Sequence, residues 1–381
     1  MMNDRELHAG LINQQGSRAA LNTPVLVLDV EALDRNIATL AGLAAKHNVG
    51  LRPHAKTHKS VDIGKRQIAA GAVGLCCAKI GEAEVLADGG IGGLLITSPV
   101  AAPAAIVRLA ALAGTATGLM ATVDNPAVAA AIDHALAAAG TTLDVVIDID
   151  PGIMRTGVAS AEAAVALAQA IAELRNLRYR GVQYYCGQQQ HIEKYDSRRG
   201  AIEDRTRYLQ TVIAALAEAG FAPEIVTGSG TGTHRIDLDL GVFTELQAGS
   251  YVFMDQQYLD CDLADGPASP FETALSVDAR VVSANHAGLV TIDAGFKSLS
   301  TDGGVATVQR GAPTDTKFFF MGDEHAALIG EGIGERMHPG DPVSLTVPHC
   351  DPTVNLYDTY HVVRGDTLVE MWSVSARGRA R

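Results

Sequence analysis

Between residues 51 and 247, short apolar runs alternate with longer segments of helical periodicity. Strands are expected at 51–55, 73–77, 93–96, 119–123, 143–150, 179–185, 224–227 and 242–247. Helical segments lie between most of them, as at 126–139, 161–174 and 198–219, and a helix at 31–47 can close the ring. Eight such units predict an α/β protein with a (β/α)8 barrel. A doubly wound open sheet is the alternative, although no Gly-x-Gly-x-x-Gly motif follows the first strand.

The pattern of the sequence changes after residue 250. Alternating runs at 279–284, 288–294, 343–349 and 361–365 lie between Gly, Pro and Asp turns, and helical periodicity nearly vanishes. This pattern predicts a C-terminal all-β domain, with the boundary near Gly249. An additional strand is expected at 25–29, before the barrel.

Composition narrows the class of protein. There are 30 Lys and Arg against 43 Asp and Glu, for a net charge of −13, which argues against a nucleic-acid partner. The longest uncharged stretch, 89–107, is interrupted by Pro99 and Pro103, so no membrane span is expected. Residues 1–16 lack the apolar core of a signal peptide. The five cysteines form no Cys-x-x-Cys pair, and we expect free thiols in the cytoplasm.

A dense group of basic residues occupies the end of the first barrel strand, in LRPHAKTHKS (51–60). Strand alternation places Arg52, His54 and Lys56 on one face, at the carboxyl end where barrel enzymes hold their chemistry. One interpretation is a solvated basic edge or a phosphate patch. The other is that Lys56 is a Schiff-base amine whose pKa is lowered by the cations beside it.

Two glycine-rich loops favour the second interpretation. TGSGTGT (227–233) follows the expected seventh strand, and QAGSY (247–251) follows the eighth. Loops at these positions often bind phosphate through backbone N–H groups. Together with Lys56, they indicate a phosphorylated aldehyde cofactor, pyridoxal phosphate. Either loop alone is also explained as an ordinary turn.

Two further residues have a structural and a functional interpretation each. Arg155, in the loop after the fifth strand, can reach the phenolate oxygen of the cofactor or pair with Asp148 or Asp150. Tyr185, at the end of the sixth strand, lies against the cofactor ring or packs in the barrel.

A third group lies in the β-domain, in VPHCDPTVNLYD (347–358). Strand alternation places His349 and Asp351 together, and an imidazole with a carboxylate can hold Mn²⁺ or Mg²⁺ in an open site. A structural hydrogen bond between the two residues explains the same pattern.

These motifs together resemble the fold-type III pyridoxal-phosphate enzymes, and within them the metal-activated D-threonine aldolases and 3-hydroxy-D-aspartate aldolases. The resemblance runs from TPVLVLD (23–29) through RPHAKTHKS, CCAKIGEAE, TGSGTGT and ELQAGSYVFMD to PHCDPT and VSARG. It implies a barrel at 30–249 and a β-domain that combines 1–29 with 250–381 and carries the metal ligands. It also implies a homodimer.

Carried onto this sequence, the resemblance identifies Lys56 as the lysine that binds the cofactor, and His349 and Asp351 as ligands of Mn²⁺ or Mg²⁺, with Co²⁺ or Zn²⁺ as alternatives. Gln247 takes the place of an arginine that faces the pyridine nitrogen in the racemases, and a neutral residue there is tolerable for an aldol cleavage. The other residues expected at the cofactor are His54, Arg155, Tyr185, Ser229, Gly230, Thr231, Gly249, Ser250 and Tyr251.

The implied activity is a lyase reaction, the retro-aldol cleavage of a β-hydroxy-D-amino acid to glycine and an aldehyde. The candidate base is metal-bound water with His191 nearby, and a plain surface position is the alternative for His191. A 3-hydroxy-D-aspartate aldolase, which releases glyoxylate, and a D-serine or D-threonine dehydratase are alternative activities. A cofactor carrier without activity fits less well, because such carriers are typically a bare barrel. The chain departs from the group at Ala78, where CCQK is common, and this removes an amide expected to help hold the cofactor.

Overall fold

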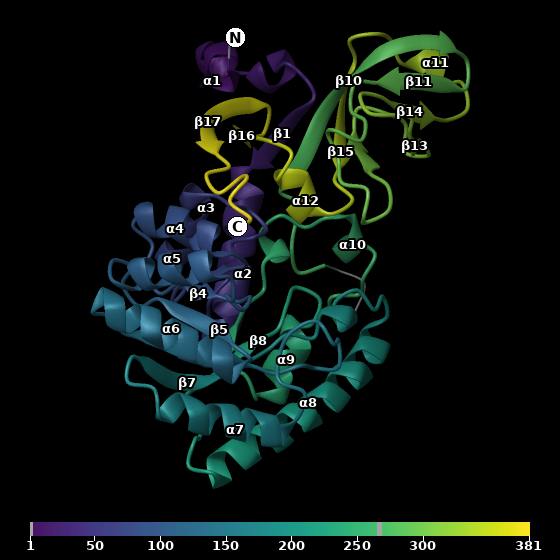
Figure 1. Cartoon of the computed structure of the whole chain (residues 1–381). Coiled ribbons are helices and arrows are strands. Elements are labelled where there is room, and N and C mark those ends of the chain that lie inside the picture. Colours follow the sequence, from purple (N-terminus) through teal and green to yellow (C-terminus); the bar gives the residue numbers. More distant parts are fainter. Residues whose placement is uncertain (1–2, 265–268) are drawn as a thin grey trace.

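The computed structural model describes residues 3–264 and 269–381, and they fold around two sheets. Eight parallel strands form the first sheet, in the order β2-β9-β8-β7-β6-β5-β4-β3. A parallel bridge between His54 and Cys76 joins β2 to β3 and closes the ring. The predicted (β/α)8 barrel is therefore confirmed, and it forms the lower body in Figure 1.

The barrel strands are two to eight residues long. They are β2 (Gly50–Leu51), β3 (Cys76–Cys77), β4 (Leu95–Ile96), β5 (Met120–Val123), β6 (Leu143–Asp148), β7 (Leu177–Tyr184), β8 (Ile225–Gly228) and β9 (Glu245–Leu246). The helices around them are α2 (Val30–Lys46), α3 (Val61–Ala69), α4 (Ile80–Asp88), α5 (Pro103–Ala113), α6 (Pro126–Ala139), α7 (Ala161–Ala172), α8 (Tyr195–Glu218) and α9 (His234–Leu240).

Local sequence sets the limits of these helices. Helix α6 begins at Pro126, whose missing N–H costs nothing in the first turn, and Asn125 caps it by accepting from the N–H groups of Ala127 and Val128. It ends at Gly140, which takes the left-handed conformation at φ 66°. The predicted helix at 126–139 has the same limits.

The second sheet is the β-domain at the top of Figure 1. Its strands are β1 (Val25–Asp29), β10 (Leu275–His286), β11 (Leu289–Ile292), β12 (Thr307–Arg310), β13 (Lys317–Phe320), β14 (Ala326–Ile329), β15 (Pro342–Thr346), β16 (Thr359–Arg364) and β17 (Thr367–Ser373). Strand β1 lies between β10 and β16, so an N-terminal strand is part of a sheet made mostly from the last third of the chain. The short helices here are α1 (Asp4–His8), α10 (Gln256–Leu259), α11 (Ile333–Arg336) and α12 (Cys350–Val354).

Two expected strands end early. The strand expected at 51–55 pairs regularly only at 50–51, and Lys56 lies in the turn that follows. The strand expected at 343–349 ends at Thr346, and Asp351 lies in the first turn of α12. Pro348 explains the early end of this strand, because proline cannot donate to a strand ladder, and Pro352 is tolerated in the first turn of the helix that follows.

All five cysteines are free and buried. Across 3–264 and 269–381, none of the helices has both the length and the apolar character that a membrane crossing requires.

Candidate active site

The carboxyl end of the barrel faces the β-domain, and Lys56 meets Asp351 there. The ammonium of Lys56 forms an ion pair with the carboxylate of Asp351, and the two side chains are 38% and 14% exposed. Burial favours the neutral acid at Asp351, but Lys56 and His349 outweigh it and hold the pKa of Asp351 well below its usual range. The pair therefore joins a barrel residue to a residue of the β-domain.

The predicted low pKa of Lys56 is wrong for this state of the protein. Burial opposes the charged amine, but the carboxylate of Asp351 outweighs it and raises the pKa of Lys56 above its usual value. The reason is a carboxylate from a distant part of the chain, where the local sequence offers only cations.

The other cations of this segment are also paired, so they form no solvated basic edge. Arg52 donates to both carboxylate oxygens of Glu245, at 2.9 and 2.7 Å. Lys59 forms a buried ion pair with Glu82. Each basic residue therefore has its own carboxylate, and the cluster is explained by pairing as well as by a phosphate.

His54 lies beside Lys56 as a neutral side chain. Its Nε2 is 3.1 Å from Oγ1 of Thr97, and its Nδ1 accepts from the backbone N–H of Lys56 at 3.4 Å. Burial and then the charge of Lys56 lower the pKa of His54 well below its usual value. The imidazole is thus uncharged at neutral pH and forms one wall of the site.

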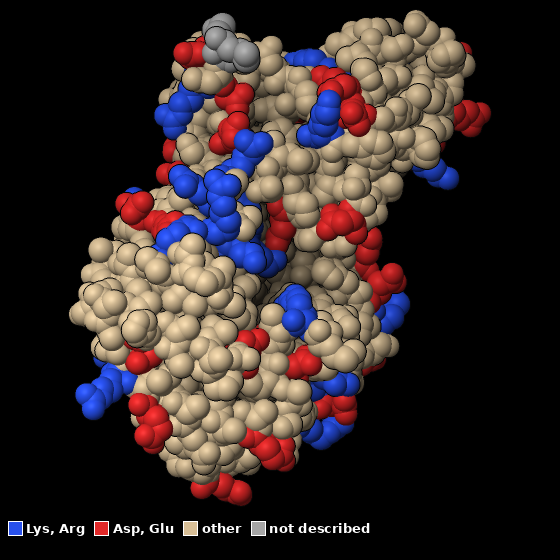
Figure 2. All heavy atoms as spheres, viewed as in Figure 1, with Lys and Arg blue, Asp and Glu red and all other residues tan. Residues whose placement is uncertain are grey.

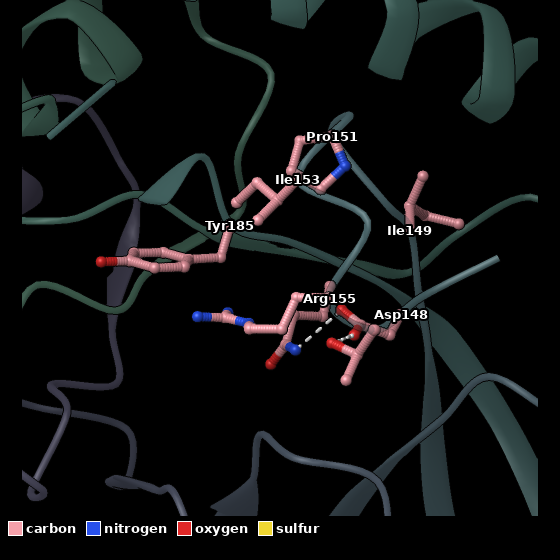
Figure 3. Close-up of a pocket in the computed structure, with 8 residues that line it drawn as sticks. Asp148, Ile149, Pro151, Ile153, Arg155 and Tyr185 are labelled. Atoms are coloured by element: carbon pink, nitrogen blue, oxygen red, sulfur yellow. Dashed lines mark hydrogen bonds between the residues drawn. The ribbon is translucent and has the colours of Figure 1, made fainter. Parts of the chain in front are cut away.

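Arg155 and Tyr185 lie close together. The guanidinium of Arg155 reaches toward the ring of Tyr185, as Figure 3 shows, with its carbon 5.9 Å from the ring centroid. Arg155 forms no ion pair with Asp148 or Asp150 among the described residues. Asp150 instead accepts from the backbone N–H groups of residues 152–154. The guanidinium therefore stays available to a bound molecule.

A chain of hydrogen bonds crosses the barrel interior. The amide nitrogen of Gln183 donates to Asp148 and to the carbonyl of Thr97, both at 2.9 Å. The amide of Gln247 donates to Oε1 of Gln183 at 3.3 Å and to the hydroxyl of Thr227 at 3.0 Å. Because a carbonyl only accepts, Thr97 fixes the orientation of Gln183, and Gln183 then fixes that of Gln247. Gln247 is thus a neutral residue whose amide is oriented by Gln183 and Thr227.

The two glycine-rich loops fit a phosphate. The hydroxyl of Ser229 is buried and has no hydrogen-bond partner in the described part of the chain. Gly230 lies so close to the amide of Gln190 that a Cβ would clash, and a Cβ on Gly249 would lie 2.6 Å from Oγ1 of Thr57. Thr231 joins the loops by accepting from the N–H of residue 251 at 3.0 Å. The Ser229 hydroxyl can donate to a bound group, and Gly230 and Gly249 leave room for that group. Both features fit an anion with several acceptor atoms, such as a phosphate.

Tyr251 does not belong to this arrangement through its side chain. Its hydroxyl accepts from Gln67 at 3.2 Å, and its ring packs 5.6 Å from that of Phe271. Tyr251 therefore points into the core, and Thr231 already engages its backbone N–H. Ser250 is buried at the start of the turn that follows Gly249.

His349 and Asp351 lie together without bonding to each other. Nδ1 of His349 is 2.8 Å from a carboxylate oxygen of Asp302, while Asp351 pairs with Lys56. No group of three or more His, Cys, Asp or Glu able to hold a metal ion occurs among the described residues. One imidazole and one carboxylate suit a divalent cation that takes its other ligands from water or substrate.

His191 lies at the same opening, against Tyr258. The two ring centroids are 4.5 Å apart, and the rings are tilted by 38°. Burial, followed by the charges of His349 and Lys56, lowers the pKa of His191 to about 4. The imidazole is therefore neutral at pH 7, and this low pKa makes it a weak base.

Two residues of this site are not predicted from the sequence. Asp302 lies in a glycine-rich loop without a motif, and Tyr258 lies in the four-residue helix α10. Neither residue type nor spacing marks them, because both reach the site through the packing of the β-domain on the barrel.

The surface in Figure 2 is hollowed between the barrel and the β-domain. Lys and Arg side chains gather along one rim of this hollow, and acidic side chains lie on the other. A molecule bound there would meet both signs of charge.

Comparison with known proteins gives two family matches. Residues 28–257 match the model of the alanine racemase N-terminal domain, and residues 274–363 match that of a putative serine dehydratase domain. A 3-hydroxy-D-aspartate aldolase of Paracoccus denitrificans is 38% identical over 363 residues, covering 94% of this chain and 93% of the relative. A D-threonine aldolase of an Arthrobacter species is 37% identical, covering 95% and 94%. The crystal structure of D-threonine aldolase from Filomicrobium marinum superposes with a TM-score of 0.91 at 38% identity, covering 95% and 97%.

Proposed function

This chain belongs to the alanine racemase-like pyridoxal-phosphate enzymes, in the group of the D-threonine and 3-hydroxy-D-aspartate aldolases, and from that premise we propose that it cleaves β-hydroxy-D-amino acids to glycine and an aldehyde. The observation that carries the proposal is the meeting of Lys56 with Asp351 at the open end of the barrel. One supplies an amine and the other a carboxylate next to an imidazole.

Pyridoxal phosphate fits the residues that surround Lys56. Ser229, Gly230, Thr231, Gly249 and Ser250 would hold its phosphate, and the amine of Lys56 would hold its aldehyde carbon. When bound, the cofactor accepts the electron pair of the Cα–Cβ bond as that bond breaks. The protein contributes the surroundings in which this happens.

Arg155 and Tyr185 would position the reacting molecules. The guanidinium of Arg155 is exposed and unpaired toward Asp148 and Asp150, so it can bind a phenolate or a carboxylate. Tyr185 is held under it, and burial raises the pKa of its hydroxyl, so the ring stays neutral. Arg155 therefore supplies a cation, and the ring of Tyr185 supplies a flat apolar surface beside it.

His191 would take the proton from the β-hydroxyl group of the substrate. With its pKa lowered to about 4, it is unprotonated over the whole neutral range. Replacing His191 with Gln should lower kcat by about 10²-fold or more. An unchanged kcat would leave the base to another group.

A divalent cation, Mn²⁺ or Mg²⁺, would be held by His349 and Asp351 and would polarise the β-hydroxyl oxygen. Support comes from the two ligand types, a carboxylate and an imidazole. Nδ1 of His349 already contacts Asp302, so Nε2 is the nitrogen that would bind the ion. Chelation with EDTA should abolish glycine release, and added Mn²⁺ should restore it.

The decisive variant is Lys56→Ala. It should lose both glycine release and the visible absorbance of the bound cofactor. Lys65→Ala, on the exposed face of α3, should retain both. Normal cleavage by the Lys56 variant would refute the proposal.

Dehydration is the second candidate, because residues 274–363 match a putative serine dehydratase domain. D-threonine and D-serine, incubated separately, distinguish the two reactions. Glycine means an aldolase, whereas ammonia and a keto acid mean a dehydratase.

The substituent at the substrate's Cβ is the remaining choice. Methyl, phenyl and carboxylate correspond to D-threonine, D-phenylserine and 3-hydroxy-D-aspartate. A β-carboxylate needs an additional cation, and Arg155 is the described residue best placed to supply one. Glycine release from the three substrates, measured side by side, identifies the preferred one.

A cytoplasmic homodimer completes the proposal. Five free, buried thiols agree with a reducing compartment. Phe296, Phe319 and Met321 expose apolar surface on the β-domain, with 44%, 60% and 54% of each residue accessible, and such surface suits a protein contact. Light scattering after gel filtration measures the mass of the assembly.

A further inference from the structure

The imidazole of His349 has a hydrogen-bond partner in the β-domain. Its Nδ1 lies 2.8 Å from Oδ2 of Asp302. A carboxylate can only accept, so a hydrogen sits on Nδ1, and an imidazole that is neutral in this arrangement carries its lone pair on Nε2. Nε2 of His349 has no hydrogen-bond partner within residues 3–264 and 269–381. The free nitrogen is therefore the one with which an imidazole binds a metal ion.

The loop that carries Asp302 is attached to the backbone around His349. The hydroxyl of Ser300 donates to the carbonyl of His349 and accepts from its N–H, both at 3.1 Å. The N–H of Ser300 also donates to the hydroxyl of Thr353, in α12, at 3.1 Å. These bonds fix the distance between the loop and the imidazole before Asp302 makes its own contact.

Glycine permits this approach. A Cβ on Gly303 would lie 2.9 Å from Cβ of His349 and 3.0 Å from the carbonyl of Pro348. Any larger residue at position 303 would push the loop outward. The close contact between the loop and His349 thus has its own sequence requirement, independent of Asp302.

We propose that Asp302 is a positioning residue of the metal site, which holds the imidazole of His349 with Nε2 toward the divalent cation. The proposal rests on the proposed function, since that function places the cation at His349 and Asp351. Asp302 acts through His349 and does not itself bind the ion. Its side chain is 54% exposed, so its removal costs little burial and leaves the fold intact.

Acting on the imidazole in this way has two physical consequences. The hydrogen bond fixes the tautomer and the ring orientation, which removes an entropic cost from metal binding. The negative charge also makes the imidazole a stronger donor. Loss of such a partner weakens metal affinity by about 10- to 100-fold.

The test measures Mn²⁺ binding to the cofactor-loaded full-length protein by electron paramagnetic resonance of the free ion. Asp302→Ala should raise the Kd for Mn²⁺ by about 10- to 100-fold, and kcat should recover at saturating Mn²⁺. Asp302→Asn keeps an oxygen that can accept from Nδ1, so its Kd should lie between those of wild type and Asp302→Ala. Asp341→Ala is the matched control, because Asp341 lies 3.8 Å from Nδ1 of the exposed His338 in the same domain. This control should bind Mn²⁺ as the wild type does.

A double-mutant cycle separates positioning from direct binding. In the background of His349→Ala, replacement of Asp302 should change the Kd for Mn²⁺ no further, because the residue through which it acts is gone. A loss that persists in that background would overturn the proposal, since Asp302 would then contact the ion or act by charge alone. An unchanged Kd in the single variant Asp302→Ala would overturn it as well.

Failure of this proposal is distinct from failure of the proposed function. Mn²⁺ binding is measured without substrate, whereas aldol cleavage is measured as glycine release. A protein that releases glycine and binds Mn²⁺ equally well before and after the substitution Asp302→Ala keeps its function and refutes the positioning role. A protein that releases no glycine but shows the expected Kd values keeps the positioning role.

Discussion

The ammonium of Lys56 and the carboxylate of Asp351 form an ion pair across the boundary between barrel and β-domain, although 295 positions separate them in the sequence. In the protein without cofactor, the ammonium of Lys56 occupies the carboxylate of Asp351 that would bind a divalent cation. The amine and the cation therefore compete for the same oxygen atoms.

The competition predicts coupled binding of the two cofactors. Mn²⁺ should bind the pyridoxal-phosphate-loaded protein at least about tenfold more tightly than the cofactor-free protein, a difference of about 1.4 kcal/mol. By reciprocity, Mn²⁺ should tighten cofactor binding by the same factor. Calorimetric titration with Mn²⁺ in both states measures the effect.

Lys56→Ala isolates the cause. Without cofactor, this variant should bind Mn²⁺ more tightly than the cofactor-free wild type, because the competing charge is absent. Lys65→Ala removes an exposed lysine of α3 and should leave the Kd unchanged. Equal affinities in all three proteins would show that Lys56 and the ion do not share Asp351.

Gly249 links the phosphate loop to the loop of Lys56. A Cβ at this position would lie 2.6 Å from Oγ1 of Thr57 and 3.1 Å from the carbonyl of His54. Gly249→Ala should therefore displace both loops and weaken pyridoxal phosphate binding by about 10-fold or more, a free-energy change of about 1.4 kcal/mol. Fluorescence titration of the cofactor-free protein gives the Kd.

A second glycine supplies the control for that variant. Gly200 lies within α8 and has no neighbouring atom within 4 Å of an added Cβ. Gly200→Ala should stabilise the helix by about 1 kcal/mol and leave cofactor affinity unchanged. Weaker cofactor binding in this variant would mean that the assay responds to general changes in stability.

Two buried histidines predict how stability responds to acid. His361 and His8 contact through Nε2 and Nδ1 at 2.8 Å. Burial, followed by the charge of His8, lowers the pKa of His361 to about 4. The folded pKa lies below the unfolded value of about 6.5, so stability is full above pH 6.5 and is lost as pH falls through 4, by up to about 3 kcal/mol.

The variant His361→Gln should flatten this dependence. A glutamine can still accept from His8, but it takes up no proton between pH 6.5 and 4. Urea unfolding at several pH values measures the slope, and His47→Gln, at an exposed position after α2, should leave it unchanged. If the unfolding free energy of the His361 variant depends on pH as that of the wild type does, groups other than His361 cause the acid sensitivity.

The sequence predicts the barrel because its evidence is local and repeated. Each strand-helix unit carries its own periodicity, and α6 also carries its caps at Asn125 and Gly140. The position of Lys56 at the carboxyl end follows from the same alternation.

The surroundings of Lys56 are not predictable in this way. Its neighbours in sequence are cations, yet its partner in space is Asp351. The same holds for Asp302, which reaches His349 across 47 positions because Ser300 and Gly303 allow the loop to approach. Contacts set by the packing of one domain on another leave no periodic trace in the sequence.

Ala78 is the departure from the group with the most direct test. It follows β3, donates its N–H to Glu82 at 2.8 Å, and lines a cavity of about 470 Å³ together with Ser98 and Arg108. The cavity has room for a longer side chain. If the amide common at this position helps to hold the cofactor, Ala78→Gln should lower the Kd for pyridoxal phosphate by about 2- to 10-fold, the contribution of one hydrogen bond.

The control for this variant lies in the same cavity. Ala104 lines it from α5, so Ala104→Gln adds the same amide from the other side. Only the Ala78 variant should retain cofactor more strongly during dialysis. Equal retention by both variants and wild type would mean that the amide plays no part in holding the cofactor.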